Sequence, residues 1–195
     1  KWIIKSNKVG HAGTLDPIAE GLLIVMVNNA TKFSDNLMKK DKEYFVELEL
    51  GYETATYDTE GEITEKYESE KIFEVINSFI GEIMQVPPMY SAIKINGEKL
   101  YELARKGIEV ERQARKVKIY SIREISIEQN KISFYTEVSS GTYIRSLVRD
   151  IGRKLGVYAT MTRLVRTKID KYSIDESVSL EEIEKKLNDE KEIFE

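Results

Sequence analysis

Alternation of apolar and polar residues predicts strands, because neighbouring side chains of a strand point to opposite faces. The clearest alternation lies in residues 43–51, where four apolar side chains share one face: Tyr44, Val46, Leu48 and Leu50. Residues 116–128 and 131–140 alternate in the same way and meet at Gln129-Asn130, which predicts a hairpin. The uninterrupted apolar run at 22–27 predicts a short buried strand, and another strand is expected around 159–165.

Helices are predicted where apolar residues recur every three or four positions. Two segments show this period, one from Ser69 to Gly81 and one from about 142 to Gly156. The predicted buried stripes are Ile72, Val75, Ile76, Phe79 and Ile80 in the first, and Ile144, Leu147, Val148, Ile151 and Leu155 in the second. Shorter helices are expected at 30–40, 99–106 and 180–187, and turns at 58–61 and 96–97. This mixture of long strands and helices predicts an α/β or α+β fold with a mostly antiparallel sheet.

Composition narrows the class of protein. A chain of 195 residues with 41% hydrophobic and 33% charged residues suits one soluble globular domain. The absence of cysteine excludes disulfides and thiolate metal sites, and a single histidine argues against a histidine-based metal site. The longest apolar run is too short to cross a bilayer and no signal peptide is visible, so we expect a cytoplasmic protein without membrane contact. The chain begins at Lys1, and we expect it to be truncated at its N-terminus.

Charge is unevenly distributed along the chain. Residues 94–123 contain nine Lys and Arg against four Glu, and residues 139–172 contain eight against two Asp. Residues 173–195 carry nine Asp and Glu against three Lys, so the acidic tail accounts for the net charge of −4. A charged face is often simply solvated, but two basic segments are also compatible with a phosphate-binding surface.

Four segments have compositions that folding alone explains poorly: GHAGTLDP at 10–17, KEY at 42–44, SSGTYIRS at 139–146 and VPPMYSAIKINGEKLYELARKG at 86–107. Each also has a plain structural explanation. Asp16 before Pro17 is a common turn sequence, and a lone His11 is more often structural than catalytic. Tyr44 is more often a core residue than a base-stacking platform. Arg145 at a helix start is usually solvated, although the helix dipole disfavours a cation there and mildly favours a specific anionic partner. The segment at 86–107 has the plain explanation of an ordinary hairpin.

Taken together and in order, these segments resemble the tRNA pseudouridine synthase B (TruB-type) family. GHAGTLDP is similar to the catalytic-loop motif of the family, which commonly reads GHTGTLDP, so that Ala12 replaces a threonine. KEY, VPPMYSAIKINGEKLYELARKG, SSGTYIRSLVRDIGRKLG and TRLVRTKI match in the same order, from about residue 8 to residue 173. The resemblance implies an α+β pseudouridine synthase fold: a central, mostly antiparallel mixed sheet flanked by helices, with a thumb insertion.

The resemblance also implies roles for individual residues. Asp16 resembles the essential aspartate, Tyr44 the tyrosine that stacks on the target base, and Arg145 the arginine that pairs with the aspartate. Tyr143 and Leu164 resemble residues that line the same pocket, and His11 a residue that contacts the flipped-out RNA. Lys94 and Arg105 lie in the segment that resembles the RNA-clamping thumb, and we expect both to bind substrate.

The implied reaction is the isomerisation of uridine-55 in the T arm of tRNA to pseudouridine, which needs neither a metal nor a cofactor. The N1–C1′ bond breaks and C5 joins C1′, so the carboxylate can add to C1′, add to the base or assist a glycal intermediate. The expected partner is tRNA, bound by a monomer without an obligatory protein partner. Two alternatives stay open: a non-catalytic tRNA-binding or tRNA-folding protein, and a guide-RNA-dependent relative of the same family. A phosphatase or glycosidase that uses Asp16 is disfavoured, because the sequence shows neither a cluster of metal ligands nor a second carboxylate paired with Asp16.

The domain organisation follows from the extent of the resemblance. Residues 1–172 are expected to form the catalytic domain, with the thumb insertion at about 88–115. Residues 173–195 are expected to form an acidic helix or tail, without a complete C-terminal RNA-binding (PUA-type) domain.

Overall fold

A seven-stranded sheet is the centre of the computed structural model, which describes residues 6–51, 68–95 and 97–192. Its neighbouring strands are all antiparallel except for β2, which pairs in parallel with β10. The order across the sheet is β11 (Tyr172–Ser173), β10 (Ala159–Ile169), β4 (Lys42–Leu50), β9 (Lys131–Val138), β8 (Arg115–Glu128) and β5 (Gly81–Gln85), with β2 (Ala19–Gly21) beside β10. The expected mostly antiparallel α+β sheet is confirmed.

The remaining elements surround this sheet. Two small two-stranded antiparallel sheets pair β1 (Val9–His11) with β3 (Val25–Val27), and β6 (Lys94–Ile95) with β7 (Glu98–Lys99). The helices are η1 (Asn28–Phe33), α1 (Ser34–Met38), α2 (Ser69–Asn77), α3 (Leu100–Arg105), α4 (Ile144–Leu155), η2 (Ile174–Glu176) and α5 (Leu180–Glu192).

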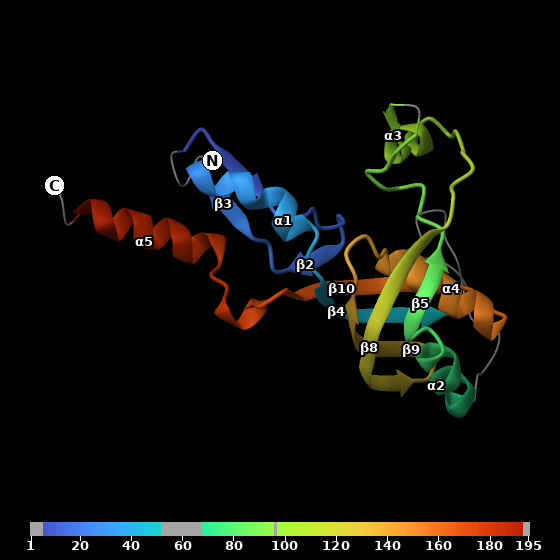
Figure 1. Cartoon of the computed structure of the whole chain (residues 1–195). Coiled ribbons are helices and arrows are strands. Elements are labelled where there is room, and N and C mark those ends of the chain that lie inside the picture. The colour runs from blue at the N-terminus through green and yellow to red at the C-terminus, as the bar shows by residue number, and fades with distance from the viewer. Residues whose placement is uncertain (1–5, 52–67, 96, 193–195) are drawn as a thin grey trace.

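Strand β4 lies between β10 and β9, and its alternation decides where the core forms. Tyr44, Val46, Leu48 and Leu50 belong to the buried apolar cluster that also contains the inner residues of α2 and α4. Both helices lie on the same side of the sheet in Figure 1. The predicted stripe of α4 is buried along its length, because Ile144, Leu147, Val148, Ile151 and Leu155 all face the sheet cluster.

Helix α4 ends where the sequence predicted. Gly156 adopts a left-handed conformation (φ 82°), which L side chains rarely accept, and it terminates the helix. Four residues before Gly156, Gly152 brings α4 close to the start of β10, because a Cβ there would lie 2.6 Å from the Cβ of Ala159. The helix is therefore held against the sheet at its C-terminal end by close backbone packing.

Two expectations about the apolar pattern were wrong. The run at 22–27 does not form a buried strand, since Leu23 and Val25 are 41% and 51% exposed. β3 pairs only with β1, outside the central sheet, so only one of its faces is covered. Ile80 lies beyond the end of α2 and is 44% exposed, although the helical period placed it in the buried stripe. The expected turn at 58–61 lies outside the described residues.

Between β5 and β8 the chain leaves the sheet for residues 86–114, which we call the excursion. It contains β6, β7 and α3, and Figure 1 shows α3 held out beyond the end of the sheet. Gln85 and Arg115 are paired in the β5–β8 register, so the excursion departs and returns at one point. At the other end of the molecule, α5 projects away from the sheet (Figure 1). Within the described residues, no helix is long and apolar enough to cross a membrane.

The Gly152 contact yields a stability prediction. Gly152→Ala is expected to lower the free energy of unfolding by about 1–3 kcal/mol, because the added methyl group would overlap Ala159 and force α4 outward. Urea unfolding followed by circular dichroism measures the change. Gly10→Ala is the control, because its Cβ would meet only Thr31 at 3.6 Å. Equal stability of the two variants would contradict the packing argument.

Candidate active site

Asp16 lies at the first position of a tight turn. The amide of Ala19 donates to the Asp16 carbonyl at 2.9 Å, and Pro17 occupies the second position, as in common β-turns. Upstream, Gly13 adopts a φ of +97°, which L side chains rarely accept, and Ala12 is fully buried with its amide bonded to the Ile24 carbonyl at 3.0 Å. The loop therefore fixes the backbone on both sides of Asp16 and presents its carboxylate.

The structure brings Arg145 to this carboxylate, although 129 positions separate the two residues in sequence. Arg145 donates from Nε to Oδ2 and from Nη2 to Oδ1, both at 2.7 Å. Nη2 also donates to the carbonyl of Tyr90 at 2.9 Å. The Arg145 side chain is only 11% exposed and that of Asp16 is 32% exposed. Such a bidentate pair orients a carboxylate strongly, and here it leaves the carboxylate accessible from solvent.

Tyr44 reaches the site from the N-terminal end of β4 and is 9% exposed. Burial raises the pKa of its phenol above the ordinary value of 10.0. The charge of Arg166 and its hydrogen bond to Tyr44 act in the opposite direction, and the nearby charge of Asp16 adds to the increase. Tyr44 is thus part of the core and a neighbour of the Asp16 carboxylate at the same time.

Tyr143 and Leu164, two of the remaining predicted residues, lie close to the Asp16–Arg145 pair or to the loop that carries Asp16. Tyr143 immediately precedes α4, and burial raises its pKa, opposed by the Ser91 hydroxyl and the charges of Arg115 and Arg145. Asp16 adds to the increase, so the carboxylate acts on this ring as well. Leu164 lies in β10 opposite Ala19 of β2 and is 4% exposed, which makes it an apolar wall behind the catalytic loop.

The other three predicted residues lie further out. His11 is exposed on β1, and its carbonyl accepts a hydrogen bond from Ser34 at 3.0 Å. Lys94 and Arg105 are exposed on the excursion, where the Arg105 guanidinium lies over the Tyr101 ring at 5.5 Å from its centroid. The structure does not bring Lys94 or Arg105 into contact with Asp16, and any shared role requires a ligand that spans both regions.

Arg166 is a part of the site that the sequence reasoning missed. Its side chain is buried, with 1% exposure, and Nε donates to the Leu22 carbonyl at 2.8 Å. Its terminal nitrogens reach the carbonyls of Gly13 at 3.3 Å and Thr14 at 3.5 Å. One guanidinium from β10 therefore holds the backbone on both sides of Asp16. The alternation of β10 could have indicated this residue, because Arg166 falls on the same buried face of the strand as Leu164, where a charged side chain is unusual.

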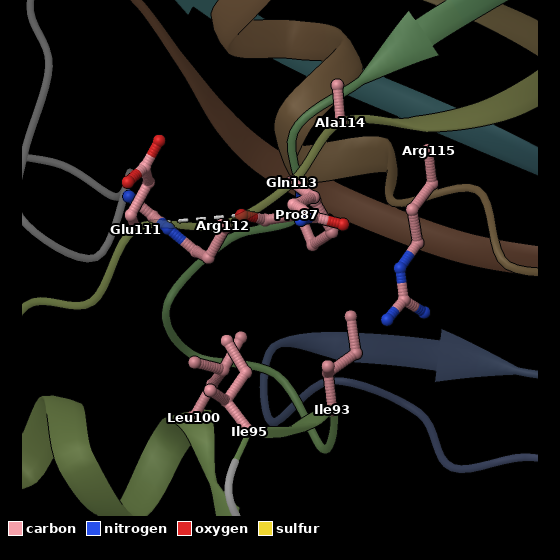
Figure 2. Close-up of a pocket in the computed structure, with 9 residues that line it drawn as sticks. All are labelled: Pro87, Ile93, Ile95, Leu100, Glu111, Arg112, Gln113, Ala114 and Arg115. Carbon is pink, nitrogen blue, oxygen red and sulfur yellow. Dashed lines mark hydrogen bonds between the residues drawn. The ribbon is translucent and has the colours of Figure 1, made fainter.

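A cavity of about 280 Å³ lies at the base of the excursion, lined by residues from the two ends of this segment and by Arg115, the first residue of β8. Figure 2 shows the apolar side chains Ile93, Ile95 and Leu100 along one wall, with the segment that carries Arg112 and leads into β8 at Arg115 facing them. Arg112 donates to the Pro87 carbonyl at 3.3 Å and to Glu109 at 3.1 Å. The cavity lies between the segment that leaves the sheet after Gln85 and the segment that returns to it at Arg115. In the part of the chain that the structure describes, no group of three or more His, Cys, Asp or Glu residues is placed to hold a metal ion.

Comparison with known proteins agrees with this geometry. A family model described as TruB family pseudouridylate synthase (N terminal domain) matches residues 1–144. A second, described as tRNA pseudouridylate synthase B C-terminal domain, matches residues 145–195. The chain belongs to the TruB family.

Individual TruB-family relatives support the assignment. The tRNA pseudouridine synthase B of Clostridium tetani is 52% identical over 188 residues, which are 94% of this chain and 65% of the relative. The Aquifex aeolicus protein of the same name is 49% identical over 185 residues, covering 92% of this chain and 64% of that one. The chain thus spans just under two thirds of the length of these relatives.

Solved structures confirm the pseudouridine synthase fold. The archaeal box H/ACA sRNP Nop10-Cbf5 complex contains a chain that is 29% identical, with a TM-score of 0.75 over 100% of this chain and 49% of that chain. An H/ACA RNP bound to a substrate RNA containing 2′-deoxyuridine gives 30% identity and a TM-score of 0.68, over 91% of this chain and 44% of that chain.

The environment of Tyr44 predicts a dependence of stability on pH. The folded chain holds the phenolic proton more tightly than the unfolded chain, because burial raises the Tyr44 pKa above 10.0. This contribution to stability is fully present below pH 10 and is lost as the pH rises through the higher folded-state pKa. Tyr44→Phe is therefore expected to lose stability less steeply than the parent above about pH 10.

Urea unfolding at a series of pH values between about 8 and 11 measures these slopes. Tyr135→Phe is the control, because Tyr135 lies opposite Phe45 and therefore on the other face of the sheet from Tyr44. If parent and Tyr44→Phe lose stability with the same slope, burial does not govern the Tyr44 proton.

Proposed function

We propose that the chain is a tRNA pseudouridine synthase that isomerises uridine-55 of the T arm to pseudouridine. The observation that carries this proposal is the bidentate Asp16–Arg145 pair beside Tyr44, formed by residues that match the family motif. The curated relatives are named tRNA pseudouridine synthase B, but this chain spans only about 65% of their length. Its activity and substrate are therefore proposed from the site.

Asp16 is the catalytic group of this proposal. An ionised carboxylate has about four lone-pair positions on its two oxygens, and Arg145 occupies one on each. The remaining positions stay available to a nucleoside, since the Asp16 side chain is 32% exposed. In the reaction the N1–C1′ bond breaks and C5 bonds to C1′. C5 then loses its proton, and N1 gains a proton, so the product is an isomer of uridine. The carboxylate serves this sequence by attack or by charge stabilisation.

Tyr44, Tyr143 and Leu164 form the proposed pocket for the base. The target atoms are inaccessible in a stacked loop, so the uridine must be flipped out at a cost of a few kcal/mol. Stacking on an aromatic ring offsets about 1–3 kcal/mol of this cost per base. Tyr44 remains protonated at neutral pH because burial raises its pKa, so its ring faces the base without a negative charge.

RNA binding is assigned to the exposed basic residues outside this pocket. His11 lies beside the catalytic loop, and Lys94 and Arg105 lie on the excursion, which we propose acts as the thumb insertion. Phosphate contacts of this kind release counterions and make binding weaker at high salt. We also propose that the catalytic unit ends near residue 172, because β11 (Tyr172–Ser173) is the last strand of the sheet.

The chain is proposed to act on tRNA without a guide RNA. The solved complexes with this fold contain Nop10, Gar1 or RNA, as their descriptions state of those assemblies. The curated matches at about 50% identity carry the name of the tRNA enzyme. Activity on an isolated T-arm RNA separates the two possibilities.

Asp16→Asn tests the reaction directly. The parent is expected to release tritium from T-arm RNA labelled at C5 of the target uridine, and Asp16→Asn is expected to release none above background. Asp170→Asn is the matched control, because this carboxylate forms an exposed ion pair with Lys40 at 3.1 Å. A folded parent that binds tRNA but releases no tritium would support the non-catalytic RNA-binding alternative.

Arg145→Ala separates catalysis from binding. Loss of the guanidinium frees Asp16 to rotate, so kcat is expected to fall by about 10²-fold or more while the Kd for tRNA changes little. Arg163→Ala is the control, because this arginine is 52% exposed and pairs loosely with Glu47 at 3.7 Å. Equal losses of binding and rate would instead make Arg145 a phosphate contact.

A further inference from the structure

Gln85, the last residue of β5, has a buried polar side chain with a defined task. Only 1% of the residue is exposed. Its Nε2 donates to the carbonyl of Tyr143 at 3.1 Å, and its Oε1 accepts from the Tyr143 amide at 2.8 Å. One side-chain amide thus pairs with both backbone groups of one residue, in the manner of a neighbouring strand. Because donor and acceptor are each matched, the amide has a single satisfied orientation.

The position of Tyr143 makes this contact important for the site. Tyr143 is the N-cap residue of α4 in extended conformation (φ −101°, ψ 112°), and its own side chain forms no cap. Gln85 therefore holds the backbone at the point where α4 begins. Arg145 follows two residues later, so the direction of the first helical turn decides where its guanidinium meets Asp16.

The residues just after Gln85 act on the same part of α4. The Val86 carbonyl accepts from Ser146 Oγ at 2.9 Å and from Arg149 Nη2 at 3.3 Å. The Tyr90 carbonyl accepts from Arg145 itself. Since Gln85 also pairs with Arg115 across β5 and β8, it stands where the excursion leaves and rejoins the sheet.

We propose that Gln85 is a positioning residue for Arg145. By fixing the Tyr143 backbone, it sets the first turn of α4 so that the guanidinium reaches both oxygens of Asp16. It also links the base of the excursion to the catalytic pair, so that the segment proposed to clamp RNA and the segment that orients the carboxylate share one support. The kinetic part of this inference rests on the proposed synthase activity; the geometric part does not.

Gln85→Met tests the kinetic part, because it keeps the length of the side chain and removes both hydrogen bonds. We expect kcat to fall by about 10- to 100-fold, since misplacement of a catalytic group by about 1 Å has effects of this size. The Kd for tRNA is expected to stay within about twofold of the parent value. Asn130→Ala is the matched control, because it removes a side-chain amide that donates to Glu49 at 2.7 Å beside the far end of β4. A kcat of Gln85→Met equal to that of Asn130→Ala overturns the proposal.

A double-mutant cycle shows whether Gln85 acts through Arg145. In an Arg145→Ala background, Gln85→Met is expected to cause no further loss of kcat, because the group that it positions is already absent. A loss that multiplies with that of Arg145→Ala would mean a general structural role and would overturn the proposal.

A third measurement does not depend on activity. The Nε–H of Arg145 is bonded to Asp16 at 2.7 Å, so its ¹H–¹⁵N resonance should exchange slowly with water and be absent from Arg145→Ala. In Gln85→Met we expect this exchange to accelerate at least about tenfold, and in Asn130→Ala to stay unchanged. Unchanged exchange in Gln85→Met overturns the proposal even if the parent proves inactive, whereas an inactive parent alone refutes only the proposed function.

Gln85→Asn keeps the test valid if Gln85→Met does not fold. It keeps the side-chain amide but shortens the side chain by one methylene, which draws the amide away from both backbone groups of Tyr143. Intermediate kcat and intermediate Arg145 exchange are expected, and parental values for both would overturn the proposal.

Discussion

The charged pair between Asp16 and Arg145 is the interaction that ties the site to the fold. Its two short hydrogen bonds join a loop near the N-terminus to a helix 129 residues later. Each partner is aimed by its own backbone, Asp16 by a tight turn and Arg145 by the first turn of α4. Neither segment has this geometry without the sheet between them, since β2 pairs with β10 and α4 packs against both β10 and β4.

A consequence of this arrangement is that the Asp16–Arg145 pair and the base of the excursion meet at one end of α4. The excursion departs after Gln85 and returns at Arg115, and its first residues contact α4 from Arg145 to Arg149. The carbonyl of Tyr90 even shares the Arg145 guanidinium with Asp16. A segment that reaches far from the sheet is thus anchored on the helix that carries Arg145.

The sequence predicted elements well where burial follows a simple period. The alternation in β4 and the apolar stripe of α4 both specify a face, and the structure buries those faces. The run at 22–27 was misread because apolar content alone does not show whether a strand joins the central sheet. The motifs identified Asp16 and Arg145, but no local pattern reveals that Arg166 or Gln85 is buried against backbone groups of a distant segment. Those contacts follow only from strand order and register.

Arg166 holds the loop around Asp16 through main-chain carbonyls alone, those of Gly13, Thr14 and Leu22. The backbone of Arg166 also lies close to the backbone of Gly21, where a Cβ would be 2.4 Å from the Arg166 carbonyl oxygen. Against β10 the loop is therefore held by its peptide groups, and its exposed side chains contribute little to this contact. Such a loop can change its outward residues, as at Thr14, over evolutionary time or by engineering, while the aspartate stays in place. Substitution is tolerated at the exposed side chains of the loop, and it is not tolerated at Gly21, where the loop backbone contacts β10.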